Sequence, residues 1–271
     1  MKSSPKGSQK GSRKRLDALL VERGLAESRS RAEALILAGT VRVGDRIVTK
    51  AGSRIAPDEP LSVDHKERFV SRAGEKLDAA LQEFGVDVAG RSCLDAGAST
   101  GGFTDVLLQR GAKRVLAVDV GYGQFAWSLR KDPRVTVLER TNVRRLTGED
   151  LPFEPDLVVA DLSFISLAVA LESLFSTTPS LGEAVLLVKP QFEAGPEDVG
   201  RGGLVRDPGV HAAAILGVAE SFGRLGFGAT GVARGAVAGR KSGNVEYPVH
   251  LVRGARSTLD EPRVGEAVAG G

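Results

Sequence analysis

Residues 93–103 read CLDAGASTGGF, and this stretch decides the fold of the chain. An apolar run ends on the carboxylate of Asp95, is followed by small residues, and gives way to a helical pattern that opens at Phe103. This order is typical of a strand, a tight turn and a helix N-terminus, where backbone N–H groups point toward a ligand. Asp119 ends the next apolar run, at a distance where an acid accepts hydrogen bonds from ribose hydroxyls. The pattern predicts a pocket for a nucleoside-containing cofactor.

The composition of the loop indicates which cofactor. A dinucleotide site needs G-x-G-x-x-G so that the backbone can close on a pyrophosphate, but here Ser99 replaces the middle glycine. A carboxylate at Asp95 would repel a pyrophosphate and would suit an ammonium group. S-adenosylmethionine carries an amino-acid end, a ribose and an adenine, and no phosphate. The loop therefore favours S-adenosylmethionine over NAD.

The same residues, 97–101, also satisfy G-x-S-x-G, the nucleophile elbow of serine hydrolases. The chain order would allow Ser99 as nucleophile, Asp161 as the acid, and His211 or His250 as the base. A hydrolase needs a histidine aimed at the serine. Because His211 lies in a helical pattern and His250 in a valine-rich run, the hydrolase is the less favoured alternative.

Length and composition describe an ordinary globular chain. The 271 residues can hold one full domain and one small one, with 42% hydrophobic and 26% charged residues. The lone Cys93 excludes an intramolecular disulfide and a cysteine metal cluster, and no metal is expected. No apolar run approaches the ~20 residues of a membrane span, and the cationic N-terminus lacks the apolar core of a secretory signal. We therefore expect a cytoplasmic protein that does not act on membranes.

Positive charge is concentrated at the N-terminus. Residues 1–68 hold 15 Lys/Arg against 9 Asp/Glu, whereas the remainder is slightly acidic. Within this part, residues 15–24 and 29–38 read as helices closed by glycine, and residues 41–43 and 46–49 alternate around Gly44-Asp45 as a hairpin. Two helices and a small sheet with exposed cations predict a unit that grips a polyanion. The candidate RNA-binding residues are Arg13, Arg15, Arg29, Arg31 and Lys50.

Beyond residue 70 the chain alternates strand and helix patterns. The predicted strands are 92–95, 114–119, 135–138, 156–161, 184–188, 226–234 and 244–253. Such alternation predicts a doubly wound α/β fold with a parallel sheet and an antiparallel last strand. Ligands of such folds bind at the carboxyl ends of the strands, where Asp95, Asp119, Asp161 and Lys189 are all expected. Because a lysine or an aspartate that closes a buried strand needs a partner, a structural ion-pair network is the plain alternative to catalysis.

Two resemblances cover nearly the whole chain. Residues 14–63, with the pattern L-D-x-L-L-V-x-x-G-L-x-x-S-R-S-x-A, resemble the RNA-binding S4 domain of a ribosomal protein and of many pseudouridine synthases. The remainder resembles the FtsJ-like ribose 2′-O-methyltransferases, and more closely the TlyA (hemolysin A) family of rRNA methyltransferases. The motifs that carry this second resemblance are S-R-A-G-E-K-L, L-D-A-G-A-S-T-G-G-F-T-D, V-V-A-D-L-S-F-I-S-L, L-V-K-P-Q-F-E and G-N-V-E-Y.

The resemblance implies a Rossmann-like class I methyltransferase with a seven-stranded, mostly parallel sheet and a small N-terminal α+β RNA-binding domain. It implies a basic tail at 1–13, an S4-type domain at 14–63, a linker at 64–70, a methyltransferase domain at 71–256 and a flexible tail at 257–271. The implied catalytic tetrad is Lys76, Asp161, Lys189 and Glu246, with Lys189 as the base that deprotonates a ribose hydroxyl. The implied S-adenosylmethionine contacts are Asp95, Gly97, Ser99, Thr100, Gly101, Phe103, Asp119 and Asn142.

The implied substrate is cytidine in 16S rRNA, 23S rRNA or both, within 30S and/or 50S ribosomal subunits. Two alternatives from other classes remain. One is an RNA-binding protein with an inactive methyltransferase fold, and the other is a membrane-active hemolysin, which the family name suggests. The four filled tetrad positions argue against the first, and the absence of a span or a basic amphipathic helix argues against the second.

Overall fold

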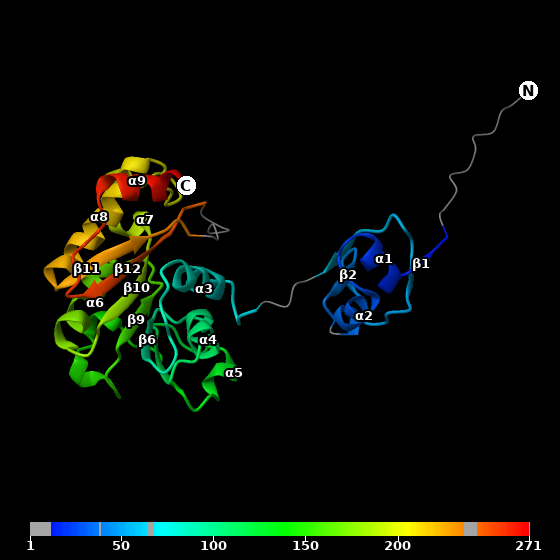
Figure 1. Ribbon diagram of the computed structural model, residues 1–271, viewed down its shortest axis with the longest axis horizontal. Coiled ribbons are helices and arrows are strands. Elements are labelled where there is room, and N and C mark those ends of the chain that lie inside the picture. The colour runs from blue at the N-terminus through cyan, green and yellow to red at the C-terminus, as the bar shows by residue number, and fades with distance from the viewer. Residues whose placement is uncertain (1–11, 38, 64–67, 236–242, 271) are drawn as a thin grey trace, which may run out of the picture. The chain divides into compact units, whose positions relative to one another are not determined.

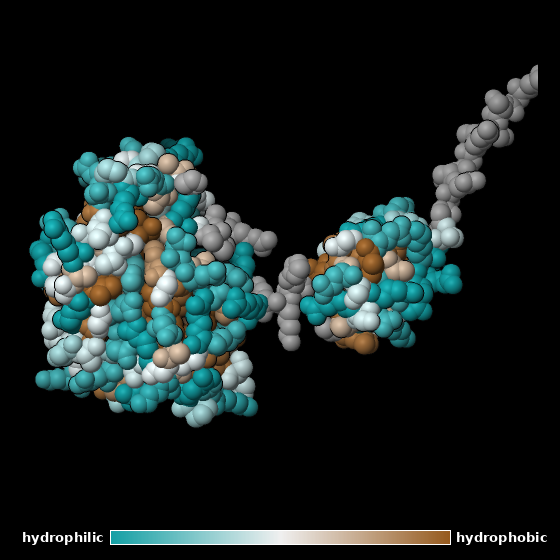
Figure 2. Space-filling model, in the orientation of Figure 1, coloured by the Kyte–Doolittle hydropathy of each residue, from teal (hydrophilic) through white to brown (hydrophobic). Residues whose placement is uncertain are grey.

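The computed structural model describes residues 12–37, 39–63, 68–235 and 243–270, and divides the chain into two compact units at residues 67 and 68 (Figure 1). Most of the predicted basic tail and residues 64–67 of the predicted linker lie outside the described residues. On the face shown in Figure 2, hydrophilic residues predominate on both units and hydrophobic ones form separate patches. Within the described ranges, no helix is long and apolar enough to cross a membrane.

The N-terminal unit packs two short helices on short strands. Its helices are α1 (Leu16–Glu22) and α2 (Arg29–Leu37). Its strands are β1 (Lys14–Arg15), β2 (Val41–Val43), β3 (Arg46–Ile47), β4 (Arg54–Ile55) and β5 (Leu61–Val63). β2 pairs with both β3 and β5, and β1 pairs with β4, all antiparallel. A small core of Leu16, Leu20, Ile36 and Val41 holds the unit together, as the predicted helix–helix–hairpin order requires.

The C-terminal unit is built on one seven-stranded sheet with the order β11-β12-β10-β9-β6-β7-β8. The strands are β6 (Ser92–Ala96), β7 (Arg114–Val118), β8 (Val135–Leu138), β9 (Leu157–Ala160), β10 (Glu183–Val188), β11 (Phe227–Val232) and β12 (Tyr247–Arg253). The pairings among β10, β9, β6, β7 and β8 are parallel, and β12 runs antiparallel between β10 and β11. The predicted α/β fold with an antiparallel last strand is confirmed.

Helices cover both faces of this sheet because the central strands bury both sets of alternating side chains. Leu94 of β6 packs on one face, with α6 (Leu167–Thr177), α8 (Pro208–Arg224) and α9 (Glu261–Ala269), whereas its neighbour Cys93 packs on the other. The second face is covered by α3 (Ala73–Glu83), α4 (Gly102–Gln109) and α5 (Trp127–Arg130). The remaining elements are α7 (Pro190–Glu193), η1 (Val143–Arg145), η2 (Gly148–Asp150) and η3 (Pro196–Asp198).

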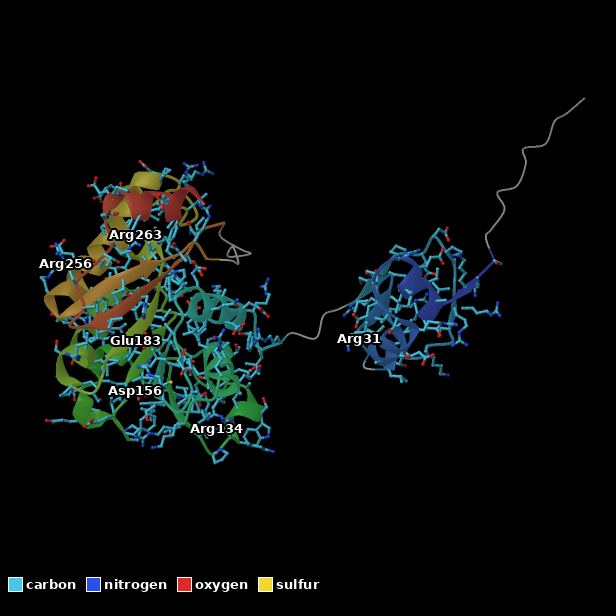
Figure 3. All side chains as sticks on the ribbon, viewed as in Figure 1. Arg31, Arg134, Asp156, Glu183, Arg256 and Arg263 are labelled. Carbon is cyan, nitrogen blue, oxygen red and sulfur yellow. The ribbon has the colours of Figure 1, made fainter. Side chains whose placement is uncertain are left out.

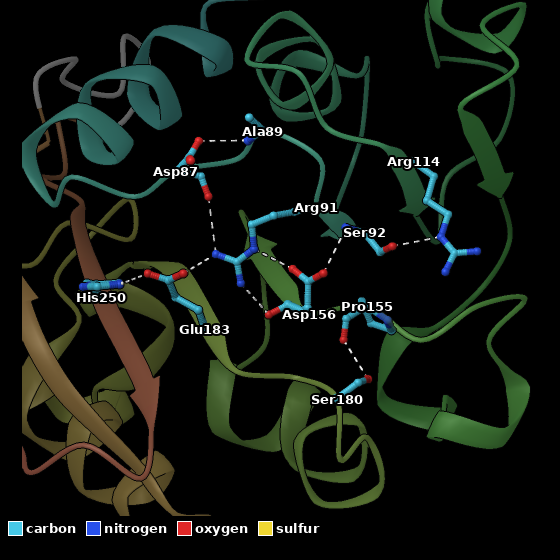
Figure 4. A network of polar contacts seen from close by, with 10 residues as sticks. All are labelled: Asp87, Ala89, Arg91, Ser92, Arg114, Pro155, Asp156, Ser180, Glu183 and His250. Atoms are coloured by element: carbon cyan, nitrogen blue, oxygen red, sulfur yellow. Dashed lines mark hydrogen bonds and ion pairs between the residues drawn. The ribbon is translucent and has the colours of Figure 1, made fainter.

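A polar network joins the amino ends of β6, β9 and β10 to the neighbouring strand β12, at the end of the sheet opposite the carboxyl ends (Figure 4). Arg91 Nε lies 2.5 Å from Asp156 Oδ1, and Nη1 of the same guanidinium pairs with Glu183. Glu183 Oε1 in turn lies 2.7 Å from His250 Nε2. Hydrogen bonding by His250 lowers the pKa of the Glu183 carboxyl, against the effect of burial. The network locks together segments that are up to 159 residues apart in the chain.

The C-terminal segment differs from the sequence-based expectation. Residues 257–271 were expected to be a flexible tail, but residues 261–269 form α9, with Asp260 capping it by accepting from Arg263 N at 3.0 Å. The prediction was wrong because only one side of this short helix is apolar. Val264 is fully buried in the core beside α8, and a single buried residue gives too weak a periodic signal to read from sequence.

Candidate active site

The loop after β6 takes the shape that its small residues predict. Gly97 and Gly101 have positive φ angles of 84° and 97°, and Ser99 adopts 49° between them. A Cβ on Gly97 would lie 2.5 Å from the backbone oxygen of Asp161, so only glycine allows the loop to approach the end of β9 so closely. Asp119 holds the loop from the other side, accepting from Ser99 N at 2.7 Å and from Gly121 N at 2.6 Å. The loop is thus held in place by contacts within the protein.

A cavity of about 280 Å³ opens beside this loop, at the carboxyl ends of the strands. Four of the eight predicted cofactor residues line it, namely Gly97, Ser99, Asp119 and Asn142. Asp161 of the predicted tetrad lies in the same wall. Asn142 also caps η1 by accepting from Arg144 N at 3.1 Å, which fixes its position on the cavity.

The other four predicted cofactor residues are not in the wall of this cavity. Phe103, the second residue of α4, is 4% exposed and packs in the core, and Thr100 and Gly101 belong to the turn before this helix. Asp95 is fully buried beneath the loop, where Thr104 Oγ1 donates to its Oδ2 at 2.7 Å. Its Oδ1 has no hydrogen-bond partner among the described residues. Burial raises the pKa of Asp95 to about 7, and the nearby carboxylates of Asp161 and Asp119 act in the same direction.

These charges test which cofactor the site suits. Asp95, Asp119 and Asp161 bring three carboxyl groups to one end of the sheet, and the carboxylates of the last two line the cavity. The carboxylate of Asp119 would repel a phosphate-bearing ligand in this cavity, whereas it would attract an ammonium or sulfonium group. The unpartnered Oδ1 of Asp95 likewise suits a cation nearby. The residues present therefore fit S-adenosylmethionine, which carries both positive groups.

The four predicted tetrad residues meet beside this cavity, although four separate segments of the chain supply them. Lys189 Nζ lies 2.5 Å from Asp161 Oδ1, Lys76 Nζ lies 3.9 Å from Asp161 Oδ2, and Lys76 Nζ donates to Glu246 Oε2 at 2.5 Å. The register of β10 on β12 pairs Val188 with Tyr247, which sets Lys189 beside Glu246. All four side chains are largely buried, with 9% to 16% of each exposed. Two lysines and two acidic residues alternate along the cluster.

A second cavity, of about 680 Å³, lies on the far side of the tetrad. Lys189 and Glu246 line it, and Ser163 and Phe164 line both cavities. Lys189 Nζ also donates to Ser163 Oγ at 3.1 Å. Residues 163 and 164 thus lie between the two cavities, next to the tetrad.

Sequence reasoning missed two residues of this second cavity. Phe164 is 89% exposed and has a positive φ of 64°, a costly combination for an aromatic residue. Phe192, on α7, lies 5.1 Å from it between ring centroids. Both stand in motifs that the sequence analysis quoted, but an aromatic residue in an apolar run reads as core, and nothing local shows that Phe164 faces outward.

The hydrolase alternative is wrong. His211 Nδ1 bonds to the Tyr247 hydroxyl at 2.8 Å and its Nε2 to the Val205 carbonyl at 3.1 Å. His250 belongs to the network at the opposite end of the sheet. In each of the two histidines, both ring nitrogens bond to groups other than Ser99, so neither histidine can serve as its base.

The predicted RNA-binding cations lie on the surface of the N-terminal unit. Arg13, Arg31 and Lys50 are exposed, and Figure 3 labels Arg31 at the edge of the unit. Arg15 and Arg29 both reach the buried Asp17, at 2.7 Å and 3.6 Å. Hydrogen bonding from Arg15 lowers the pKa of the Asp17 carboxyl, so this acid stays charged and orients both guanidinium groups. These two arginines are thus held in place and partly neutralised.

Comparison with known proteins covers both units. The FtsJ-like methyltransferase family model matches residues 69–253, and the S4 domain model matches residues 14–61. A 16S/23S rRNA (cytidine-2′-O)-methyltransferase, TlyA of Mycobacterium tuberculosis, is 53% identical over 87% of this chain and 88% of its own. Hemolysin A of Brachyspira hyodysenteriae is 40% identical over 88% of this chain and 99% of its own. A solved structure of a candidate hemolysin from Streptococcus thermophilus is 38% identical and covers 95% of each chain, with a TM-score of 0.71.

Proposed function

The chain belongs to the FtsJ-like methyltransferase family, and on that premise we propose that it transfers a methyl group from S-adenosylmethionine to the ribose 2′-hydroxyl of cytidine in 16S rRNA, 23S rRNA or both, within ribosomal subunits. The observation that carries the proposal is the tetrad, closed by contacts from Glu246 through Lys76 and Asp161 to Lys189 and set between two cavities. An inactive fold has no reason to keep all four buried charges in this arrangement. The alternative of an inactive RNA-binding protein is therefore not favoured.

The first cavity supplies the cofactor contacts in this proposal. Asp119 would accept hydrogen bonds from the ribose hydroxyls, because each of its oxygens retains acceptor capacity beyond its backbone bond. Gly97 and Ser99 would lie along the amino-acid end, and Asn142 near the adenine. The other four predicted cofactor residues would act without lining the cavity. Thr100, Gly101 and Phe103 would fix the shape of the loop, and Asp95 would place a carboxyl group beneath it. When bound, S-adenosylmethionine supplies a methyl group made electrophilic by a positively charged sulfur.

The tetrad residues handle the proton of the substrate. A ribose hydroxyl is a weak acid, so its oxygen needs a base beside it and a positive charge to stabilise the alkoxide. Lys189 would accept this proton at Nζ, with Asp161 orienting its side chain. Lys76 would remain an ammonium group held by Glu246 and would stabilise the developing negative charge. Burial of all four excludes water and strengthens these interactions.

The N-terminal unit supplies the grip on rRNA in this proposal. Exposed Arg13, Arg31 and Lys50 would contact phosphates, and Arg15 and Arg29 would do so in orientations fixed by Asp17. A modified ribose in 16S rRNA would identify the 30S subunit as a substrate, and one in 23S rRNA would identify the 50S subunit.

The test replaces Lys189 by alanine and measures methyl transfer to purified 30S and 50S subunits, with the modified ribose mapped on each rRNA. We expect at least a hundredfold loss of rate with nearly unchanged calorimetric affinity for S-adenosylmethionine, because Lys189 is not in the wall of the first cavity. Lys113→Ala is the matched control and should retain full activity, because Lys113 is exposed and directly precedes β7, at the end of the sheet opposite the tetrad.

A mutant that keeps more than about a tenth of the wild-type rate, a loss below ~1.4 kcal/mol, would refute the role of Lys189 as base. Wild-type protein that binds the cofactor but methylates neither subunit would favour the inactive RNA-binding protein. Release of dye from lipid vesicles by the same preparation would support the hemolysin instead.

A further inference from the structure

Ser163 is a polar residue beside the tetrad to which the proposed mechanism gives no role. It follows Asp161 by two residues, and it lines both cavities. Its Oγ accepts a hydrogen bond from Lys189 Nζ at 3.1 Å, and Asp161 Oδ1 lies 2.5 Å from the same nitrogen. Among the residues that the structure describes, no other oxygen atom is a partner of this nitrogen. Asp161 and Ser163 thus approach one lysine nitrogen from the same short loop.

The number of these contacts matters for proton transfer. An amine nitrogen has four tetrahedral positions, and in Lys189 the side-chain carbon Cε occupies one. To accept a proton, the amine must direct its lone pair at that proton, while its two N–H groups need acceptors elsewhere. With Asp161 alone, the lone pair would be free to occupy either of two positions, and Ser163 takes one of them. The position that is left is open to a hydroxyl in the second cavity, because Lys189 lines that cavity.

The loop that carries Ser163 is fixed at both ends. At its start, Asp161 N donates to a backbone carbonyl of β6 at 3.0 Å, which continues the pairing of β9 with β6. At its end, Leu167 N donates to Glu193 Oε1 at 2.8 Å, which binds the first turn of α6 to α7. Between these contacts Phe164 holds a positive φ of 64°, which costs free energy and persists only where the surroundings impose it. The fixed backbone keeps the Ser163 oxygen in place beside the lysine.

We propose that Ser163 is a positioning residue which, together with Asp161, directs the lone pair of Lys189 toward the substrate. The proton of the ribose hydroxyl moves to Nζ as the ribose oxygen takes the methyl group, so an O–H bond breaks and an N–H bond forms. Ser163 acts on this step through the lysine and does not itself contact the substrate. The inference rests on the proposed function, because Ser163 has this part only if Lys189 is the base.

The test compares wild-type protein with Ser163→Ala and Ser163→Thr in methyl transfer to ribosomal subunits. Ser163→Ala should lower kcat at least about fivefold, because the lone pair of Lys189 is no longer directed. The KM for subunits and the calorimetric affinity for S-adenosylmethionine should stay within about twofold of wild type, because no binding contact is removed. Ser163→Thr keeps the hydroxyl oxygen and should recover most of kcat.

The dependence of kcat on pH separates an effect through Lys189 from a direct effect on the substrate. A hydrogen bond to the ammonium form favours that form, so its loss should move the acidic limb of the Ser163→Ala profile to lower pH, by about half a unit or more. The other charged groups around the lysine are the same in both proteins, namely Asp161, Lys76, Glu246 and Asp95. A lower kcat with an unmoved profile would place Ser163 on the substrate and would overturn the inference.

Ser176→Ala is the matched control, because it removes another exposed serine hydroxyl, which donates to the Glu172 carbonyl within α6. It should behave as wild type in every assay. All assays are run well below the measured Tm of each variant, so that a change in folding stability does not enter kcat. If Ser163→Ala keeps the wild-type kcat, or loses activity through KM or cofactor affinity alone, the inference is wrong while the proposed function stands. If wild-type protein methylates no ribose in either subunit, the proposed function itself fails.

Discussion

Replacing Arg91 by alanine should destabilise the C-terminal unit by more than any exposed ion pair could. Arg91 is 22% exposed, and its guanidinium bonds to two carboxylates and to the backbone oxygen of Asp156 at 2.8 Å (Figure 4). Its removal leaves Asp156 and Glu183 side by side, with only Ser92 N and His250 as partners. Without their shared cation, these two neighbouring carboxylates repel each other at the amino ends of the strands.

The magnitude follows from the exposure of these groups. Removing one partner of a fully buried ion pair costs about 3–5 kcal/mol, whereas an exposed pair contributes about 0–1 kcal/mol. Asp156 and Glu183 are 42% and 21% exposed, so the expected loss lies between these limits, at about 2–4 kcal/mol. For a domain of this size each kcal/mol shifts Tm by about 2–4 °C, which predicts a fall of roughly 5–15 °C.

Differential scanning calorimetry of the full chain checks this, with Arg134→Ala as the matched control. Arg134, labelled in Figure 3, pairs with Asp132 at 2.8 Å, but 41% of the arginine side chain is exposed. Its loss should shift Tm by no more than about 2–4 °C. If the two mutants unfold within a degree of each other, the network does not hold the strand ends together and the reasoning is refuted.

Three further outcomes are expected. Asp119→Ala should weaken calorimetric binding of S-adenosylmethionine at least about tenfold, because ribose acceptors and the bond that fixes the loop are lost together, whereas Ser99→Ala, which keeps the backbone N–H, should change affinity little. The pKa of Asp95 is raised to about 7 from an unfolded value near 4, so the unfolding free energy of the wild-type protein should fall as pH rises between these values. Asp95→Asn lacks this titrating group, so its unfolding free energy minus that of wild type should grow over the same range. A constant difference would contradict the raised pKa of Asp95. Arg31→Ala should flatten the slope of log affinity for ribosomal subunits against log salt by about 0.7 to 0.9, and an unchanged slope would remove Arg31 from the phosphate contacts.

The sequence by itself predicted the architecture, and the family resemblance of its motifs named the four candidate tetrad residues. Strand and helix patterns are local, because side chains alternate with a period of two in strands and about 3.6 in helices, and turns are marked by glycine. Hence the seven strands, the parallel order and the loop at Gly97 could all be predicted. Lys189 and Asp161 stood out for a local reason too, since each charge ends an apolar run.

Only the tertiary structure decided which groups meet. Lys76 and Glu246 are 170 residues apart, and they touch because β12 is inserted beside β10 with Val188 opposite Tyr247. The same packing buries Asp95 and Phe103 and places His250 against Glu183, at the end of the sheet opposite the loop. It also leaves Phe164 exposed beside Gln191. No local period encodes these outcomes, because each depends on the order and register of strands that are distant in the chain.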